Sequence, residues 1–337
     1  MKKRLLSLCL VAVLLFSMTS CALFAKKKTE NNDSTEINVY TLNGTTGFGM
    51  AKLMNDAKAG NTTEKYNFSV QSDASVVTTA LLNGSADIAA LPTNAAANIY
   101  NKSGGGVVVL AVNTLGCLYL LTNQNQTVTS FNDLRGKTIY VPAQNPTFIF
   151  TYLCKQNGLE VGKDITIDST TYAQPASLKD AVAAGIADIA VLPEPMVTIA
   201  INTAKSANNG TTVTNAMDLT SEWNKVSASG SLVQGCVVVR RAFLEGHPEA
   251  VENFLKEYKA SIEFLSKDID SAAQMIVDNG IFTNAAVAKK ALPNCNVCFL
   301  DGAEMKTAMN TYLGILSGIA PASIGGTLPA DDFYYAK

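Results

Sequence analysis

The chain contains few of the side chains that most often perform catalysis or bind metal ions. His247 is the only histidine among its 337 residues, which excludes a multi-histidine metal site and leaves one candidate base for a catalytic triad. Cys295 and Cys298 have the spacing of half a zinc site, but no second cysteine pair has that spacing and no histidine lies near them in the sequence. The residue types therefore favour non-covalent recognition of a small molecule, and we predict no enzymatic activity, no metal and no cofactor.

Short polar residues follow the apolar, strand-like segments of the chain, where their amides, hydroxyls and carboxylates could bind a ligand. In an open α/β sheet, the loops after the carboxyl ends of the strands surround the ligand crevice. The same residue types are also preferred at helix caps and turns, so a purely structural role stays open for each of them. The predicted ligand-binding residues are Asn43, Gly44, Thr45, Thr46, Ser72, Asp73, Thr93, Asn94, Gln144, Asn145, Thr147 and Glu194.

The segments that must position these residues alternate between strand-like and helix-like patterns. Short β-rich or continuously apolar runs are followed by stretches in which apolar residues have helical spacing. Such alternation predicts an α/β protein with parallel sheets covered by helices. In the first part of the chain, the predicted strands are residues 37–42, 68–70, 88–91 and 107–112, and the predicted helices are residues 45–59 and 74–83.

An internal repeat indicates that the chain contains two lobes of one design. The sequence GSADIAALP at residues 84–92 recurs as GIADIAVLP at residues 185–193, with seven identical positions. We expect each glycine to end a helix in the left-handed region, each run from Ile to Leu to form a buried strand, and each proline to end that strand. Because both strands would then end at a ligand-binding edge, the repeat predicts one cleft between the lobes.

Two β-rich runs, residues 116–122 and 235–239, bracket the second copy of the repeat. They predict that the chain crosses twice between the lobes, with residues 37–116 and 236–337 in the first lobe and residues 123–234 in the second. Cys117 and Cys236 would lie on the two crossover strands, either as a disulfide or as two buried thiols, and the same alternatives stay open for Cys295 and Cys298. Helices predicted at residues 247–267, 286–291 and 303–316 would pack on the first lobe.

The first 36 residues are typical of export and anchoring rather than of a folded domain. A basic start precedes an apolar run of about a dozen residues, which is shorter than the roughly 20 that span a bilayer. Small residues then precede Cys21 in a pattern that resembles the bacterial lipobox, in which the signal is cleaved and the cysteine is lipidated; an ordinary signal peptide with an incidental cysteine is the alternative. We predict a lipoprotein signal peptide over residues 1–20, a flexible tether over residues 21–36, and lipid anchoring on the extracytoplasmic face of the cell membrane.

Several of these segments resemble solute-binding proteins of ABC importers, in the branch that binds nitrate, sulfonates, taurine and thiamine-pyrimidine precursors. The resemblance is carried by SFNDLRGKTIYVP at residues 130–142, ADIA in both repeats, PEP at residues 193–195 and EGHPEA at residues 245–250, and it covers nearly the whole chain after the tether. It implies the two-lobed type 2 periplasmic-binding-protein fold, with two crossover strands as a hinge and C-terminal helices packed on the first lobe. It also implies a monomeric receptor that closes on a small molecule and delivers it to an ABC permease and its ATPase.

One departure from the family pattern bears on the ligand. Relatives often carry Gly-Ser after the Val-Pro, whereas this chain has AQNP at residues 143–146, and Pro146 removes a backbone donor. The proposed loops also contain no arginine, so a neutral or cationic heterocycle such as a pyrimidine is favoured over a sulfonate or nitrate. Phe148, Tyr172 and Trp223 are candidates to stack on such a ring, although aromatic residues also commonly belong to the core.

Two other functions stay open. The protein could sense a ligand for a membrane signalling partner instead of importing it. It could also be a lipid-anchored enzyme that uses Asp73 or Glu194 as a general base with a raised pKa. Nucleic acid is excluded as a partner, because 26 basic against 28 acidic residues leave no basic field to attract it.

Overall fold

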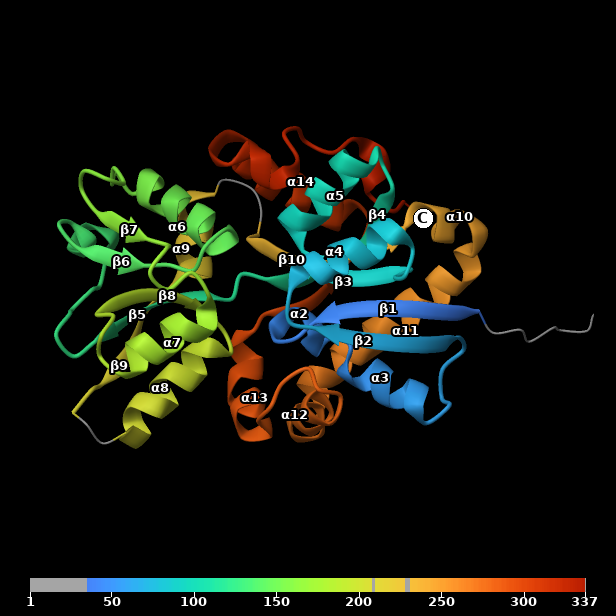
Figure 1. The fold of residues 1–337 in the computed structure, drawn as a ribbon, viewed down its shortest axis with the longest axis horizontal. Coiled ribbons are helices and arrows are strands. Elements are labelled where there is room, and N and C mark those ends of the chain that lie inside the picture. Colours follow the sequence, from blue (N-terminus) through green and yellow to red (C-terminus); the bar gives the residue numbers. More distant parts are fainter. Residues whose placement is uncertain (1–34, 208–209, 228–230, 337) are drawn as a thin grey trace, which may run out of the picture. The chain divides into compact units, whose positions relative to one another are not determined.

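The computed structural model describes residues 35–207, 210–227 and 231–336. They form two β-sheets with helices packed against them (Figure 1), and this confirms the predicted α/β fold class. Cys21 and the predicted signal peptide lie outside the described residues, as does the predicted tether apart from its last two residues, Thr35 and Glu36. Within the described part of the chain, no helix has both the length and the apolar character needed to cross a membrane.

The first sheet contains six strands in the order β11-β4-β10-β3-β1-β2. Strands β1, β2 and β3 are parallel, and β10 is inserted antiparallel between β3 and β4. The central strands are rich in β-branched and small apolar residues and are buried on both faces, as expected for a sheet covered by helices. The strand bounds are β1 (Glu36–Leu42), β2 (Lys65–Gln71), β3 (Ile88–Pro92), β4 (Val107–Leu115), β10 (Val233–Arg240) and β11 (Val297–Leu300).

The second sheet contains five strands in the order β7-β6-β8-β5-β9. They are β5 (Leu118–Asn123), β6 (Thr138–Tyr140), β7 (Thr166–Asp168), β8 (Ile189–Pro193) and β9 (Val213–Asp218). The run at residues 116–122, which the sequence suggests as a crossover strand, crosses between the sheets only at Gly116 and Cys117. From Leu118 onward it is a fully buried strand that pairs with both β8 and β9, because pairing on two sides satisfies its backbone inside the second sheet.

The helices flank the two sheets in separate groups. Beside the first sheet lie α2 (Thr45–Phe48), α3 (Ala51–Lys58), α4 (Ala74–Asn83), α5 (Thr93–Ser103), α10 (Arg241–Gly246), α11 (Pro248–Lys267), α12 (Ile269–Asp278), α13 (Ala285–Ala291) and α14 (Gly302–Ile319). Beside the second lie α6 (Asn145–Gln156), α7 (Pro175–Ala183), α8 (Met196–Ala207) and α9 (Leu219–Val226). Four single 3-10 turns complete the described elements: η1 (Phe131–Leu134), η2 (Leu292–Asn294), η3 (Pro321–Ile324) and η4 (Asp331–Phe333).

The prediction of one helix over residues 45–59 is wrong, since the structure has two helices there. The interruption lies at Gly49 and Met50, where the chain packs tightly against α11. A Cβ at Gly49 would stand 2.8 Å from a carbon of Ile262, and one at Gly47 would stand 2.1 Å from the Leu42 carbonyl oxygen. Tertiary packing therefore overrides the helical pattern of this segment.

The two copies of the repeat have the structure expected of them. Gly84 and Gly185 follow their helices with φ angles of 81° and 74°, in the left-handed region that glycine adopts without strain. The buried strands β3 and β8 come next, and each ends at its proline. Asp87 and Asp188 precede these strands and each accepts a hydrogen bond from an asparagine side chain of a neighbouring strand.

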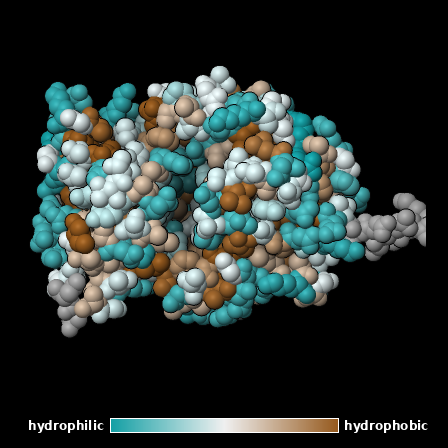
Figure 2. Space-filling model, viewed as in Figure 1, coloured by the Kyte–Doolittle hydropathy of each residue, from teal (hydrophilic) through white to brown (hydrophobic). Residues whose placement is uncertain are grey.

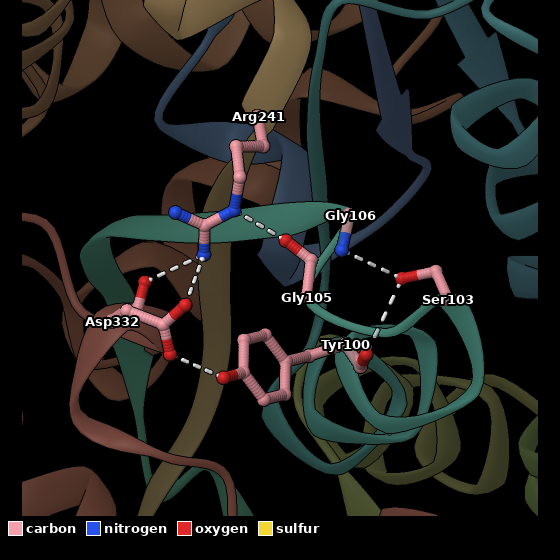
Figure 3. A network of polar contacts seen from close by, with 6 residues as sticks. All are labelled: Tyr100, Ser103, Gly105, Gly106, Arg241 and Asp332. Carbon is pink, nitrogen blue, oxygen red and sulfur yellow. Dashed lines mark hydrogen bonds and ion pairs between the residues drawn. The ribbon is translucent and has the colours of Figure 1, made fainter.

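The helices after β10 pack on the first sheet, as predicted, and α13 and α14 also contact the helices of the second sheet. A polar network holds the end of the chain in place (Figure 3). Arg241 donates to the backbone carbonyl of Gly105 and forms an ion pair with Asp332, and the Tyr100 hydroxyl donates to the same carboxylate. This network joins α5, α10 and η4.

The five cysteines among the described residues are all free. Neither Cys117 with Cys236 nor Cys295 with Cys298 forms a disulfide. Of the two alternatives that the sequence leaves open, the structure therefore has the unpaired thiols.

Candidate ligand-binding cavity

A cavity lies between turns of the first sheet and helix starts of the second sheet. Its volume of about 460 Å³ suits a small molecule. The face drawn in Figure 2 is hollowed near its centre. Loops after β1 and β8 both reach the cavity, in agreement with the expectation that strand ends surround it. Its lining consists of Asn43, Gly44, Thr45, Thr46, Cys117, Pro175, Ala176, Lys179, Pro193, Glu194, Pro195, Met196, Ile199, Gly280, Ile281, Phe282 and Thr283.

The turn from β1 into α2 forms the wall on the side of the first sheet. The Asn43 amide donates to the Gln71 carbonyl, and the Gly44 amide donates to the Ile281 carbonyl at 3.0 Å. Gly44 has a φ of 78°, a conformation that a residue with a side chain would adopt only with strain. The Thr45 hydroxyl donates to the backbone carbonyl of Glu194 at 2.7 Å, so this turn is hydrogen-bonded to the opposite wall.

The first turns of α7 and α8 form the wall on the side of the second sheet. The initial N–H groups of a helix have no partner inside it and carry a partial positive charge, which favours a negatively charged group nearby. Lys179 lines the cavity from α7 and forms an ion pair with Asp180. Lys179 and Glu194 are the charged residues of the lining.

Glu194 is buried, with 4% of its surface exposed, and its carboxylate is turned toward its own helix. One carboxylate oxygen accepts from the Thr198 amide at 3.1 Å, and the other accepts from the Thr198 hydroxyl at 2.9 Å. Burial raises the pKa of Glu194, while the hydrogen bonds from Thr198 act in the opposite direction. The carboxylate therefore caps α8, with both of its oxygens accepting hydrogen bonds from Thr198.

The remaining lining is mostly apolar. Ile281 and Phe282 come from the turn between α12 and α13, and Met196 and Ile199 come from α8. Burial, followed by the charge of Glu194, raises the pKa of the Cys117 thiol to about 12, so this thiol stays protonated at neutral pH. The cavity thus combines a wall of two helix starts, which carries the Lys179 ammonium and the capping carboxylate of Glu194, with an apolar floor.

Five of the predicted ligand-binding residues line this cavity: Asn43, Gly44, Thr45, Thr46 and Glu194. The others lie outside the lining; Ser72 and Gln144 are exposed, and the rest have hydrogen-bond partners or are buried. Asp73 accepts from the Ser75 amide as the N-cap of α4, after the exposed Ser72, and the Thr93 hydroxyl donates to the Val233 carbonyl. Asn94 is buried beside it.

The predicted residues of the loop before α6 are also outside the cavity. The Thr147 hydroxyl donates to the Pro142 carbonyl, and the Asn145 side chain accepts from the Tyr312 hydroxyl. Gln144, the residue before α6, has a φ of 67°. Trp223, suggested as a stacking residue, is fully buried and packs against Tyr152 and Tyr312.

Sequence reasoning did not identify Lys179, Phe282 and the other residues of the α12–α13 turn. Lys179 belongs to the helix before the second repeat, so its position relative to that repeat was an available signal. The turn at residues 280–283 carries no motif, and it reaches the cavity only because α12 packs on α3 and α13 packs on α8.

Comparisons with known proteins agree with this architecture. The family model for the periplasmic substrate-binding protein of phosphonate ABC transporters matches residues 54–283. No curated protein matches the chain.

Solved structures show the same fold at low sequence identity. An ABC transporter protein from Parabacteroides distasonis is 22% identical, with a TM-score of 0.74 over 90% of this chain and 100% of that one. The periplasmic aliphatic sulphonate-binding protein SsuA from Escherichia coli is 14% identical, with a TM-score of 0.68 over 90% and 92% of the two chains. The ligand-binding component of an ABC-type import system from Staphylococcus aureus, solved with zinc bound, is 15% identical, with a TM-score of 0.67 over 90% and 97%.

The family match covers more than half of the sequence, and the likeness to solved substrate-binding proteins extends over both sheets. It also confirms the resemblance seen in the sequence motifs. The chain belongs to the phosphonate-type family of periplasmic substrate-binding proteins of ABC transporters.

Proposed function

We propose that this substrate-binding protein takes a small organic anion, a phosphonate or a sulfonate, and delivers it to an ABC permease and its ATPase. The observation that carries this proposal is the wall formed by Lys179 and the starts of α7 and α8. A tetrahedral oxyanion placed there would accept hydrogen bonds from the Lys179 ammonium and from N–H groups in the first turn of α7 after Pro175, because the start of α8 is already capped by Glu194. The apolar residues Ile281, Phe282 and Met196 would contact the organic part of the ligand.

This ligand class differs from the heterocycle that the sequence favours. That preference came from the AQNP loop, from the absence of arginine in the proposed loops, and from amide-rich loops together with Glu194. In the structure that carboxylate accepts both hydrogen bonds of Thr198. A pyrimidine stacked on Phe282, which lines the cavity, is the second candidate.

Calorimetric titration with phosphonates, alkanesulfonates and pyrimidines tests the ligand class. We expect one anion class to bind, and K179Q to weaken its binding by about tenfold or more, because a charge-assisted hydrogen bond contributes about 1.5–3 kcal/mol. The matched control is K205Q, which removes the same charge from an exposed position on α8 that is not part of the lining. A pyrimidine that binds the parent protein and K179Q equally, with no anion bound, would contradict the proposal.

We propose transport rather than turnover, and this can be tested on the same samples. After prolonged incubation of the protein with the bound phosphonate, ³¹P NMR should show the compound unchanged. Appearance of inorganic phosphate or of a new phosphorus signal would favour an enzyme instead. Loss of uptake in cells that lack the partner permease would separate import from signalling.

We also propose that the mature protein is a monomer anchored through lipid on Cys21. The support is the lipobox-like sequence before this residue. In cells, C21S should move the protein from the membrane fraction to the soluble extracytoplasmic fraction, whereas C9S, within the predicted signal peptide, should leave it in the membrane fraction. Retention of C21S at the membrane without lipid would overturn the anchor.

A further inference from the structure

The turn that forms one wall of the cavity has little structure of its own. It leads into α2, a helix of four residues that has no side-chain cap at its start. The Gly47 amide bonds back to Gly44 at 3.0 Å, and the Met50 amide bonds to Gly47 at 2.9 Å. A single turn is not stable by itself in water, so contacts from outside must set the direction of Thr45 and Thr46.

One of these outside contacts is the side chain of Asn113 on β4. Its amide nitrogen donates to the Thr46 carbonyl at 3.2 Å and to the Tyr258 hydroxyl at 3.0 Å. Its amide oxygen accepts from the Thr114 hydroxyl at 3.1 Å. Asn113 is 1% exposed and is not part of the cavity lining, so all of its polar atoms are used inside the protein.

The neighbouring strand makes room for this side chain. A Cβ at Gly235 on β10 would stand 2.5 Å from the Asn113 amide oxygen, which is closer than real side chains approach. Asn113 also lies two residues before Leu115, where the chain leaves the first sheet toward Cys117. Asn113 thus links the end of β4, which leads into the crossing segment, to the turn of the cavity wall.

We propose that Asn113 is a positioning residue for ligand binding: it holds the Thr46 carbonyl and thereby orients the turn that presents Thr45 and Thr46 to the ligand. This inference rests on the proposed use of the cavity. Asn113 acts through the turn and does not itself touch the ligand. Loss of its amide therefore loosens the turn and weakens binding, with the rest of the fold retained.

Two variants test the proposal by independent routes. N113L keeps the size of the side chain and removes the amide. G235A keeps asparagine at position 113, but its added Cβ displaces the side-chain amide of that residue. Y258F is the matched control, because it removes the other partner of the same amide while the bond to Thr46 stays.

The first readout needs no ligand. Hydrogen exchange of the peptide covering residues 43–50 should be accelerated tenfold or more in N113L and in G235A, with exchange in α4 unchanged. Y258F should change exchange in residues 43–50 less than threefold. Unchanged exchange at residues 43–50 in G235A or in a folded N113L overturns the proposal, as does equal acceleration in Y258F.

The second readout is the affinity for 2-aminoethylphosphonate and for ethanesulfonate, measured by calorimetry. N113L and G235A should bind whichever compound the parent protein binds at least tenfold more weakly, and Y258F within twofold. Equal losses in all three variants would mean general destabilisation and would overturn the positioning role. If the parent protein binds neither compound, the proposed ligand class fails, and the exchange experiment still decides the role of Asn113.

Discussion

Burial and hydrogen bonding shift the pKa of the Glu194 carboxyl group in opposite directions. Burial favours its neutral form and raises its pKa, whereas the Thr198 amide and hydroxyl favour the ionised form. A carboxyl group with a raised pKa in the folded state binds its proton more tightly there than in the unfolded chain. Its favourable contribution is therefore present below the unfolded pKa, near 4.5, and is lost as the pH rises through the folded pKa.

The raised pKa of Glu194 predicts how the substitution E194Q changes the melting temperature. The amide stays neutral and can still accept from the Thr198 amide, so E194Q should melt at the same temperature as the parent protein or a few degrees higher at pH 7.5. The difference should shrink as the pH falls toward 4.5, because the parent carboxyl group then also becomes neutral. Differential scanning fluorimetry between pH 4 and pH 8 measures this dependence.

The control for E194Q removes the partner instead of the carboxylate. T198V deletes the hydroxyl that donates to Glu194 and should lower stability by about 1–2 kcal/mol at neutral pH. If E194Q is also destabilised at pH 7.5, the charge-assisted hydrogen bonds at the start of α8 outweigh the cost of burying the charge.

At the scale of elements, Asp73 is a case in which a helix-capping role competes with a predicted ligand-binding role. It is the N-cap of α4, and its carboxylate accepts from the Ser75 amide at 2.8 Å. The structure leaves Asp73 outside the cavity lining. Its predicted role as a ligand contact therefore competes with a cap that the structure contains.

D73A should lower the melting temperature by about 2 °C or more, because alanine cannot accept the hydrogen bond at the start of α4. D73N should retain most of the stability, since asparagine is an equally good N-cap. Neither should change the affinity for the ligand by more than about twofold. A loss of affinity in D73N at unchanged melting temperature would restore Asp73 to the ligand site.

At the scale of the whole folded unit, the segment from α13 to η2 joins the two sheets. The Lys290 ammonium on α13 donates to the Asn202 side chain of α8 at 2.8 Å. The Tyr119 hydroxyl on β5 donates to the Asn294 carbonyl at 3.0 Å. The family resemblance implies a hinge motion between the lobes, and we expect these bonds to form only when the lobes close.

The double variant K290A/Y119F should therefore favour the open arrangement and weaken ligand binding by about two- to tenfold, although neither position lines the cavity. Small-angle scattering of the ligand-free protein should show a larger radius of gyration for this variant than for the parent. K289A is the control, because Lys289 pairs with Asp270 on α12, beside the same sheet. Equal radii and affinities in K290A/Y119F and the parent protein would argue against a closing role for this segment.

Local signals in the sequence determined much of the fold. The repeat at Gly84 and Gly185 predicted two helix ends, two buried strands and their terminal prolines, because glycine conformation and apolar periodicity act over a few residues. The helix that begins at Pro248 and ends at Lys267 was predicted with nearly the observed bounds for the same reason. The two β-rich runs at residues 116–122 and 235–239 predicted the two lobes, and the family motifs implied the type 2 periplasmic-binding-protein fold.

Tertiary structure alone decided the rest of the cavity lining and how its side chains are used. It turned the Glu194 carboxylate to Thr198, brought Phe282 beside the turn at Thr45, and divided residues 45–59 into two helices. Each of these outcomes depends on segments that are far apart in the chain, such as α2 with α11 or β8 with the α12–α13 turn. The periodicity of one segment encodes which of its faces is buried, but the residues that the face meets are set by sheet order and helix packing.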